Sequence, residues 1–375
     1  ISDLKDISKL SKMGGRTIVT YLITTVIAVS IGLTLVNIIN PGNSISEETR
    51  TELVEGYTDS TSKYKETAKM QKESGPLQAL VDLVPQNIFS AATSNRNMLQ
   101  VIFFAVFFGI GLILIPEDKS KTVKDFFDGV NEVILKMVDL IMLIAPLAVF
   151  ALLANVVVTS GNPDLLVALV KYAGTVVLGL ALMIVFYLVV VGTFVKKNPF
   201  WFLKEISPAQ LLAFSTSSSA ATLPVTMERV EEHIGVDKEV SSFVLPVGAT
   251  INMDGTSLYQ GVAAVFVSQA LGFHLDLGDQ LTIILTALLA SIGSAAVPGA
   301  GMVMLIIVLE SIGFPPEKYA IALALIFAVD RPLDMCRTMI NVTGDATVSM
   351  LVAKSVGKLG KPRVKNWDDN YDAVK

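Results

Sequence analysis

The stretch Asp334-Met-Cys-Arg337-Thr338-Met-Ile-Asn341-Val-Thr-Gly-Asp345 brings two carboxylates, a guanidinium, a hydroxyl and an amide into an otherwise apolar segment. On one helix, four of these polar residues fall at i, i+4, i+7 and i+11 and share a face: Asp334, Thr338, Asn341 and Asp345. Arg337 lies about one turn from Asp334 on the same side. A charged group at membrane depth costs roughly 2.5–3.5 kcal/mol unless it is paired or faces a polar cavity. The stripe therefore indicates a site for a polar substrate or an ion.

The composition indicates a helical membrane protein. Of the 375 residues, 52% are hydrophobic and only 17% are charged, whereas soluble domains average about 25% charged. The apolar stretches are too long and continuous for the alternating strands of a membrane barrel. The single Cys excludes an intrachain disulfide and a thiolate zinc site, and the two His do not favour a metal site or a proton relay. A net charge of −5 gives no reason to expect a nucleic-acid partner.

Seven apolar segments are expected, and several exceed the ~20 residues that one span needs. Such segments are tilted, broken or folded back on themselves. The segments are 15–39, 77–115, 126–158, 165–194, 243–271, 281–312 and 320–352.

The distribution of Lys and Arg predicts the orientation. Basic residues are found in an expected loop around Lys119, Lys121 and Lys124, at Lys196–Lys197 and after the last apolar segment. The loops at 160–164 and 272–279 contain no Lys or Arg. We therefore expect a multi-pass protein of the plasma membrane with both ends of this chain cytoplasmic and the polar loop 40–75 outside.

A short internal repeat points to two re-entrant hairpins. Ser219-Ala-Ala-Thr-Leu-Pro224 is similar to Ser294-Ala-Ala-Val-Pro298, and each lies within an apolar stretch. Paired interruptions of this kind indicate inverted repeats with a binding site near the membrane midplane. A short repeat of Ser and Ala also arises by chance, so this pattern alone does not decide the matter.

The run Gly248-Ala-Thr250-Ile-Asn252-Met253-Asp254-Gly255-Thr256 predicts a break in a helix. Unwound carbonyls, together with Asn and Asp oxygens, form a site that suits a hard cation. The alternative is a structural Asp that caps a kink. Upstream, Tyr21, Thr24 and Thr25 share one helix face, which by itself is typical of packing, because membrane hydroxyls commonly bond back to their own helix.

The serine cluster at 215–219 does not indicate a hydrolase, because no His or Lys base flanks it. We expect no enzyme activity, and hydroxyl and N–H groups at a hairpin tip suit carboxylate binding better. Arg337 has the geometry to clamp a carboxylate in bidentate fashion. Alternatively, Arg337 forms an internal ion pair with Asp334. The residue can also switch between this ion pair, when the site is empty, and the ligand carboxylate, when it is occupied. Asp334 and Asn341 would then receive an ammonium group.

At these residues the chain resembles the glutamate/aspartate transporter family, the dicarboxylate/amino acid:cation symporters, and in particular its prokaryotic members. The resemblance extends from Gly14 onward, and the Asn-Met-Asp-Gly-Thr and Arg-Thr…Asn-Val-Thr-Gly-Asp motifs are its most specific parts. Four blocks match in order: 217–224, 248–256, 291–301 and 334–345.

The resemblance implies a substrate site of seven residues for an acidic amino acid. In it the serine pair belongs to the first hairpin tip, Thr256 and Arg337 hold the side-chain carboxylate, and Asp334 binds the amino group. Thr338 and Asn341 contact the amine or the main carboxylate. The seven are Ser218, Ser219, Thr256, Asp334, Arg337, Thr338 and Asn341.

The resemblance also implies three sites for sodium ions, with Met253 between the ions and the substrate. The first combines carbonyls of Gly248, Asn252 and Asn341 with the carboxylate of Asp345. The second uses backbone oxygens of Thr250, Ser291, Ile292 and Ser294 and is closed by the second hairpin. The third consists of Tyr21, Thr24, Thr25, Asn252 and Asp254.

The implied architecture is an all-α membrane transporter with two re-entrant hairpins and inverted repeats, working as a homotrimer in the lipid bilayer by an elevator mechanism. The expected division comprises a first transport-domain span (1–40), an extracellular loop (41–76), scaffold and trimerisation spans (77–160), a transport-domain span (161–199), hairpin 1 (200–233), a broken span (234–272), hairpin 2 (273–314), the last span (315–357) and a cytoplasmic tail (358–375).

The chain departs from the family pattern in two respects. Family members have two further spans before the point where this sequence begins, so we expect an incomplete scaffold here. Archaeal members also place an Arg just before the serine pair, and animal members place one beside the Asp of the last helix, where this chain has Ser217 and Met335. The sequence does not decide whether Arg331 takes over that role.

The expected function is therefore sodium-coupled symport of L-aspartate or L-glutamate. The alternatives are a proton-coupled glutamate or C4-dicarboxylate symporter and, from another class, a non-transporting binding or assembly subunit.

Overall fold

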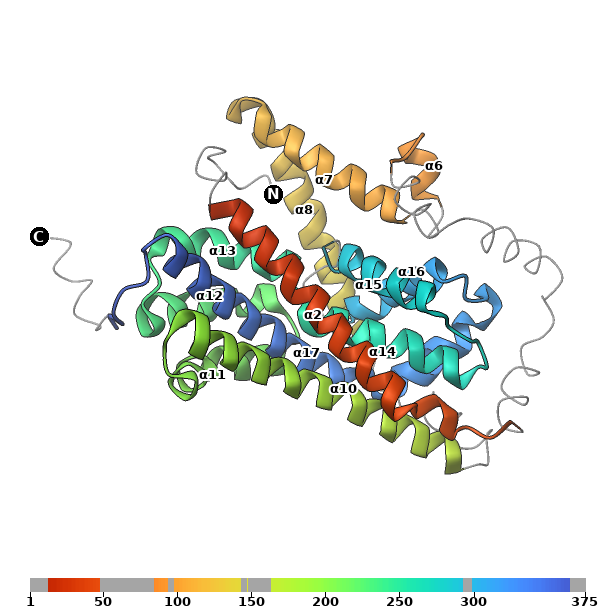
Figure 1. Cartoon of the computed structure of the whole chain (residues 1–375). Coiled ribbons are helices and arrows are strands. Elements are labelled where there is room, and N and C mark those ends of the chain that lie inside the picture. Colours follow the sequence, from red (N-terminus) through yellow and green to blue (C-terminus); the bar gives the residue numbers. More distant parts are fainter. Residues whose placement is uncertain are drawn as a thin grey trace, which may run out of the picture.

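The computed structural model describes residues 13–47, 84–93, 98–142, 147, 163–292 and 299–364. Within these ranges every regular element is a helix, and the β-type contact is a single antiparallel bridge between Val236 and Leu359. The expectation of an all-α protein is confirmed for the part of the chain that is described. Figure 1 shows α2 and α10–α17 packed into an elongated core, with α6, α7 and α8 along one side.

Two long apolar helices form the outer layer of this core. Helix α2 (Gly15–Ile39) coincides with the first expected apolar segment, and α10 (Pro163–Val190) continues into η4 (Val191–Val195). Within the described residues, these two helices are long and apolar enough to cross a membrane, with mean hydropathies of 2.3 and 2.7. Val19 and Val170 are among the apolar side chains that they expose, as lipid-facing helices do.

The next two expected segments are each divided into a pair of helices. Residues 243–271 fall in α13 (Lys238–Ile251) and α14 (Asp254–Ala270), and 281–312 fall in α15 (Leu277–Ile292) and α16 (Ala300–Ser311). The first division lies at Asn252 and Met253, whose ψ angles of 86° and 54° are not helical. The helical backbone is thus interrupted where the sequence favours unwinding.

Helix α17 (Tyr319–Ser355) is the central helix of the core, and α10, α11, α13 and α14 all pack against it. Helices α11 (Pro199–Thr216) and α12 (Ser219–Glu228) meet at Ser217, where a φ of 51° reverses the chain. Asn198 caps α11 by accepting bonds from the N–H groups of Phe200 and Trp201. The π-helical turn η5 (Arg229–Ile234) then leads to α13.

The third group comprises α6 (Ile88–Ala92), α7 (Met98–Leu114) and α8 (Glu117–Met142). The expectation of a basic loop around Lys119–Lys124 is wrong, because these residues lie in the first turns of α8. Glu117 and Asp118 occupy the first turn, where carboxylates favour a helix N-terminus. Most of the expected polar loop 40–75, and the end of segment 126–158, fall outside the described residues.

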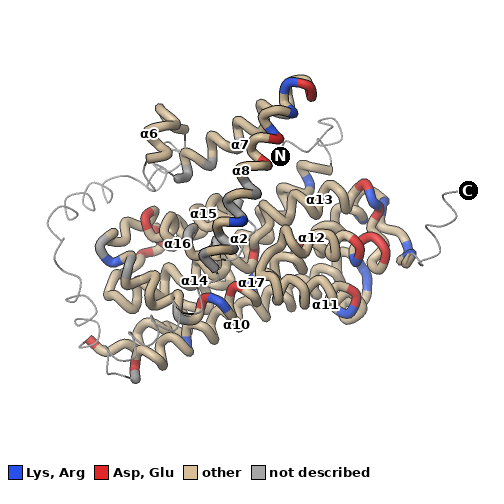
Figure 2. Tube along the Cα trace, turned by 180° about the vertical axis from the view of Figure 1, so that it is seen from behind, with Lys and Arg blue, Asp and Glu red and all other residues tan. Residues whose placement is uncertain are grey.

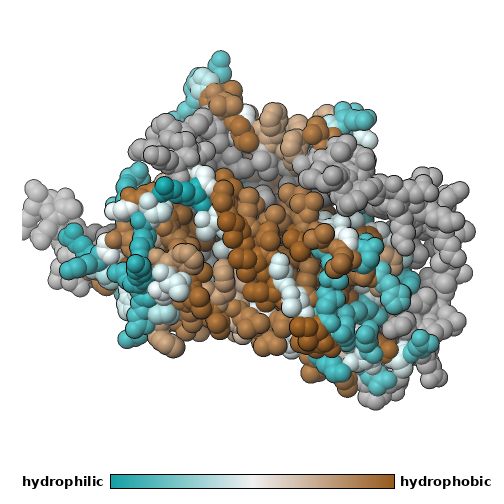
Figure 3. Space-filling model, in the orientation of Figure 1, coloured by the Kyte–Doolittle hydropathy of each residue, from teal (hydrophilic) through white to brown (hydrophobic). Residues whose placement is uncertain are grey.

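The surface of the core separates into an apolar middle and polar ends. Figure 2 shows most charged residues near the two ends, with a small charged group at mid-length on α17. Figure 3 shows a broad hydrophobic face between hydrophilic patches. This distribution is that of a protein whose middle lies in lipid and whose ends lie in water.

The first turn of α2 and the last turn of α17 lie at the same end of the core. The Arg16 Nη1 group donates to the Ser355 carbonyl oxygen at 2.8 Å. The segment after α17 then pairs with the loop before α13, since the Gly360 N–H donates to the Gly235 carbonyl at 2.8 Å. A hydrogen bond to Glu239 raises the pKa of Lys358 in this segment.

Candidate functional site

The polar stripe faces the protein interior along one side of α17. Asp334 is 6% exposed, Asn341 and Asp345 are each 3% exposed, and Arg337 is fully buried. By contrast, Met335, Cys336 and Met339 are only half-buried. The helix is therefore more polar toward the protein than toward its surroundings, as expected for a membrane helix that lines a site.

At the N-terminal end of the stripe, Arg337 is held by two carboxylates. Its Nη2 group donates to Asp334 Oδ1 at 2.6 Å and lies 3.2 Å from Asp330 Oδ1. The guanidinium carbon lies 3.8 Å from the centre of the Tyr259 ring, in a cation–π contact. The Nε and Nη1 groups are buried and have no hydrogen-bond partner among the described residues. These two nitrogens, with three N–H donors between them, are available to a ligand carboxylate.

Helix α16 closes over this end. The Gly299 N–H donates to Asp334 Oδ2 at 3.0 Å. A Cβ atom at Gly301 would lie 2.9 Å from Arg337 Nη1 and 3.1 Å from Thr256 Cγ2, so a larger residue would require these side chains to shift. The start of α16 is therefore in direct contact with the expected substrate residues.

In the middle of the stripe, Asn341 joins α17 to the beginning of α14. The Asn341 Nδ2 group donates to the Thr256 hydroxyl at 3.3 Å, and the Gly255 N–H donates to Asn341 Oδ1 at 2.8 Å. Thr338 instead donates to the Asp334 carbonyl oxygen of its own helix at 2.9 Å. The structure thus brings Thr256 and Asn341 together and leaves the Thr338 hydroxyl bonded along its helix.

At the C-terminal end, two carboxylates are surrounded by neutral donors. Asp254 Oδ1 accepts from the Thr25 hydroxyl and Asp254 Oδ2 accepts from the Tyr187 hydroxyl, both at 2.6 Å. Asp345 Oδ1 accepts from Asn252 Nδ2 at 2.9 Å. Among the described residues, no Lys, Arg or His forms an ion pair with either carboxylate.

The backbone of α13 comes unusually close to Asp345. A Cβ atom at Gly248 would lie 2.4 Å from both Asp345 Oδ1 and the Tyr21 hydroxyl. Tyr21 itself donates to the Val244 carbonyl oxygen at 3.0 Å, and Thr24 lies 3.5 Å from Asn252 Oδ1. This end is therefore a dense group of oxygen atoms, the donor set that hard cations prefer.

The expected first and third ion sites share this group of oxygens. Met253, 3% exposed, lies at the break between α13 and α14. Its place between the ions and the substrate stays a prediction. The residues that gather here are Tyr21, Thr24, Thr25, Gly248, Asn252, Asp254 and Asp345.

The expected second ion site is described only in part. Thr250 is exposed, and its hydroxyl bonds back to Val247 at 3.1 Å, while the buried Ser291 hydroxyl bonds back to Leu288 at 2.8 Å. Ile292 ends α15, and Ser294 lies outside the described residues. This set stays a prediction.

The serine pair lies where α11 meets α12. Ser218 is the N-cap of α12, and its hydroxyl accepts the Ala221 N–H at 3.1 Å. Ser219 begins the helix and is 5% exposed. A capping serine leaves backbone N–H groups at a helix N-terminus, where anions bind readily. The pair's role toward a substrate stays a prediction.

Three residues of the site were missed from sequence. Asp330 extends the stripe by one turn, at i−4 from Asp334, and that spacing was a usable signal. Tyr259 lies three residues after Thr256 on α14, so the same rule would have found it. Tyr187 lies on a continuously apolar helix, and no local pattern marks it.

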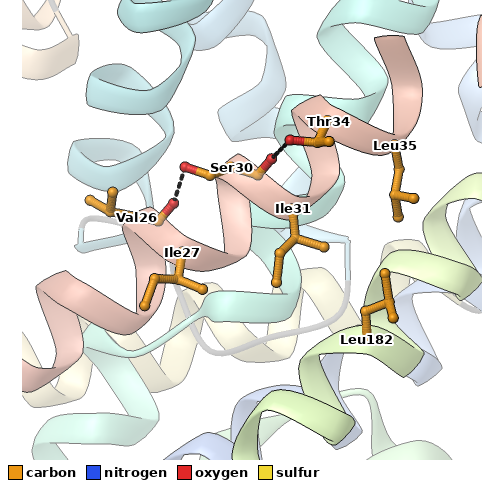
Figure 4. A pocket seen from close by; sticks show the side chains of 7 residues that line it. All are labelled: Val26, Ile27, Ser30, Ile31, Thr34, Leu35 and Leu182. Carbon is orange, nitrogen blue, oxygen red and sulfur yellow. Dashed lines mark hydrogen bonds between the residues drawn. The ribbon is translucent and has the colours of Figure 1, made fainter. Parts of the chain in front are cut away.

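An apolar groove on the outside of the core is not part of this site. It lies between α2 and α10 and is lined by Ile27, Ile31 and Leu182 among others (Figure 4). Its hydroxyls, Ser30 and Thr34, both bond back along α2 at 2.7 Å. The groove therefore offers no free polar group to a charged ligand.

Comparison with known proteins gives consistent results. A model of the sodium:dicarboxylate symporter family matches residues 1–355. The proton/sodium-glutamate symport protein of Geobacillus stearothermophilus is 35% identical over 371 residues, covering 98% of this chain and 84% of that protein. The proton/glutamate-aspartate symporter of Escherichia coli is 35% identical over 385 residues, covering 100% of this chain and 80% of that protein. An excitatory amino acid transporter of Caenorhabditis elegans is 38% identical over 376 residues, covering 91% of this chain and 73% of that protein.

Proposed function

This chain belongs to the sodium:dicarboxylate symporter family, and from that membership and the site we propose that it is a secondary active symporter for acidic amino acids, L-aspartate or L-glutamate, coupled to sodium. The protein is a membrane transporter of all-α architecture. Relatives from bacteria and animals are named as glutamate, glutamate-aspartate or excitatory amino acid transporters, which supports the substrate class.

One observation supports ion coupling above all others. Asp254 and Asp345 are buried and hydrogen-bonded to hydroxyl and amide groups, without a cationic side chain as partner in the described part of the chain. An isolated buried carboxylate is strongly unfavourable in its ionised form. Bound sodium would neutralise both groups and order the oxygen atoms around them.

The Arg337 end supports an amino acid with two carboxylates. The Nε and Nη1 groups of Arg337 would bind the side-chain carboxylate, and Asp334 would accept the ammonium group. Because Asn341 and Thr256 connect the two ends, ions and substrate would favour the same ordered state, which is a reciprocal coupling free energy.

The mechanical part of the proposal is supported by the contacts of α11 with α12 and of α15 with α16. The α11–α12 and α15–α16 pairs would be re-entrant hairpins related by inverted repeats, and the α16 side would be the outer gate of an elevator-type transport domain. The protein would act as a homotrimer in the plasma membrane, with the domain division given above. Arg16 and Ser355 support placing both helix ends on one side, which we assign to the cytoplasm.

The test is uptake of radiolabelled L-aspartate into liposomes that contain the purified protein and an inward sodium gradient. We expect uptake that rises with external sodium and ceases when choline replaces it. Uptake that is unchanged in choline would contradict sodium coupling. Absence of uptake together with tight aspartate binding would instead support the non-transporting binding subunit.

A second candidate is proton coupling, and the same two carboxylates favour it. Protonation would also remove the cost of burying Asp254 and Asp345, and the Geobacillus relative is named for both ions. The distinguishing measurement is uptake in choline at pH 5.5 with an inward proton gradient. Uptake there would establish protons as sufficient, and preference for succinate over aspartate would point to a C4-dicarboxylate substrate.

A further inference from the structure

Arg331 is a charged residue of α17 that has no role in the site described so far. Its Nη1 group lies 3.7 Å from Asp334 Oδ2, close enough for an ion pair but too far for a hydrogen bond. That nitrogen is buried and has no hydrogen-bond partner in the part of the chain that the structure describes, although the side chain as a whole is 43% exposed. The Nη1 edge of the guanidinium thus lies in the site, and the rest of the side chain is partly exposed.

The exposed part of Arg331 indicates where water reaches the site. A guanidinium in contact with hydrocarbon is costly, so the exposed part of this side chain requires water or a polar neighbour. Pro332, the next residue, is exposed as well. We take this surface of α17 to be the opening through which a ligand approaches Asp334.

The charges at this end of α17 balance only when Arg331 is included. Asp330 and Asp334 contribute two negative charges, and Arg337 contributes one positive charge. With Arg331 the formal sum is zero, and without it the sum is −1. A ligand with two carboxylates and one ammonium has a net charge of −1 and would be repelled by a site of the same sign.

We propose that Arg331 is a specificity-determining residue that sets the charge of the substrate site and thereby selects anionic ligands. It acts from the opening through electrostatic attraction and does not displace Arg337 from the ligand carboxylate. The inference rests on the proposed function for the identity of the ligand. The proposal predicts that the contribution of Arg331 to the binding free energy increases with the net negative charge of the ligand.

The test compares three ligands of similar size in competition binding to the purified full chain at constant sodium: succinate (net charge −2), L-aspartate (−1) and L-asparagine (0). In Arg331→Gln we expect a loss of affinity of about fivefold for aspartate, since a partly exposed charge contributes modestly. The loss for succinate should be about the square of that factor. Asparagine should change less than about twofold.

Arg331→Lys is the matched control, because it keeps the charge and changes the shape. It should stay within about twofold of the native protein for all three ligands. Added choline chloride should reduce the difference between the native protein and Arg331→Gln, because salt screens exposed charges.

Three outcomes would overturn the proposal: an equal loss for all three ligands, unchanged aspartate affinity in Arg331→Gln, or a Lys variant that behaves like the Gln variant. Failure of the proposed function is a separate result. If the native protein binds succinate and not aspartate, the amino-acid assignment is wrong, while succinate against asparagine still tests Arg331.

Discussion

Asp334 and Asp345 lie three turns apart on one face of α17, and their surroundings differ. Asp334 is 2.6 Å from a buried guanidinium, whereas Asp345 has an amide donor and a close glycine backbone around it. The first end of the stripe has a cationic side chain beside its carboxylates, and the second has none among the described residues. Under the proposed function, the first end would select the organic ligand and the second would depend on ions.

The largest expected effect comes from removing the internal cation. Arg337→Cys leaves Asp330 and Asp334 buried without it, and loss of one partner of a buried pair costs about 3–5 kcal/mol. We expect aspartate affinity to fall more than about 100-fold and neutral amino acids such as serine to be accepted. Calorimetric titration with both ligands measures this. Arg363→Cys in the exposed tail is the control, and retained aspartate affinity in the first variant would refute the role of Arg337.

The next largest effect is expected when the carboxylate charge at the C-terminal end of the stripe is removed. Asp345→Asn should raise the sodium concentration for half-maximal thermal stabilisation by more than about tenfold, because one of the two carboxylate charges that would attract the ion is lost. Melting temperature as a function of sodium chloride, with choline keeping ionic strength constant, gives this value. Asp118→Asn on α8 should leave the curve unchanged. A full sodium response in Asp345→Asn would show that this carboxylate does not bind the ion.

Two glycine substitutions separate the ends sterically. The added methyl of Gly248→Ala would contact Asp345 and Tyr21, so this variant should lose its sodium response. The added methyl of Gly301→Ala would contact Arg337 and Thr256. This variant should therefore keep the sodium response and bind aspartate about tenfold more weakly. Gly174→Ala on α10, where nothing lies within 4 Å, should be neutral or slightly stabilising. If both variants affect both ligands equally, the two ends are not separate.

The smallest effect concerns one hydroxyl. Thr25→Val removes the 2.6 Å bond to Asp254 and should lower the free energy of unfolding by about 1.5 kcal/mol. Thr34→Val, on the same helix, removes a hydroxyl that bonds only to its own backbone and should change stability by less than about 0.5 kcal/mol. Denaturant titration in detergent compares them. Equal effects would mean that the bond to Asp254 adds nothing beyond packing.

Much of the fold was predictable because membrane helices are marked by continuous apolar sequence. Helix α2 has the bounds expected from its pattern, and the break at Asn252 and Met253 is found where polar residues and glycine interrupt an apolar segment. The basic stretch before residue 126 is helical and not a loop, because Glu117 and Asp118 favour a helix N-terminus directly before it. The role of Tyr187 is not predictable from sequence, because its hydroxyl lies in an apolar helix and its partner, Asp254, lies on another helix.

The polar face of α17 and the residue types on it are readable from the sequence, because a helical period of 3.6 fixes the neighbours within one helix. Which groups surround Asp254 and Asp345 depends instead on contacts between helices. Thr25 and Asp254 are 229 positions apart, and Asn252 and Asp345 are 93 apart. Contacts between residues so distant depend on how α2, α13, α14 and α17 pack against one another, and no local pattern records that packing.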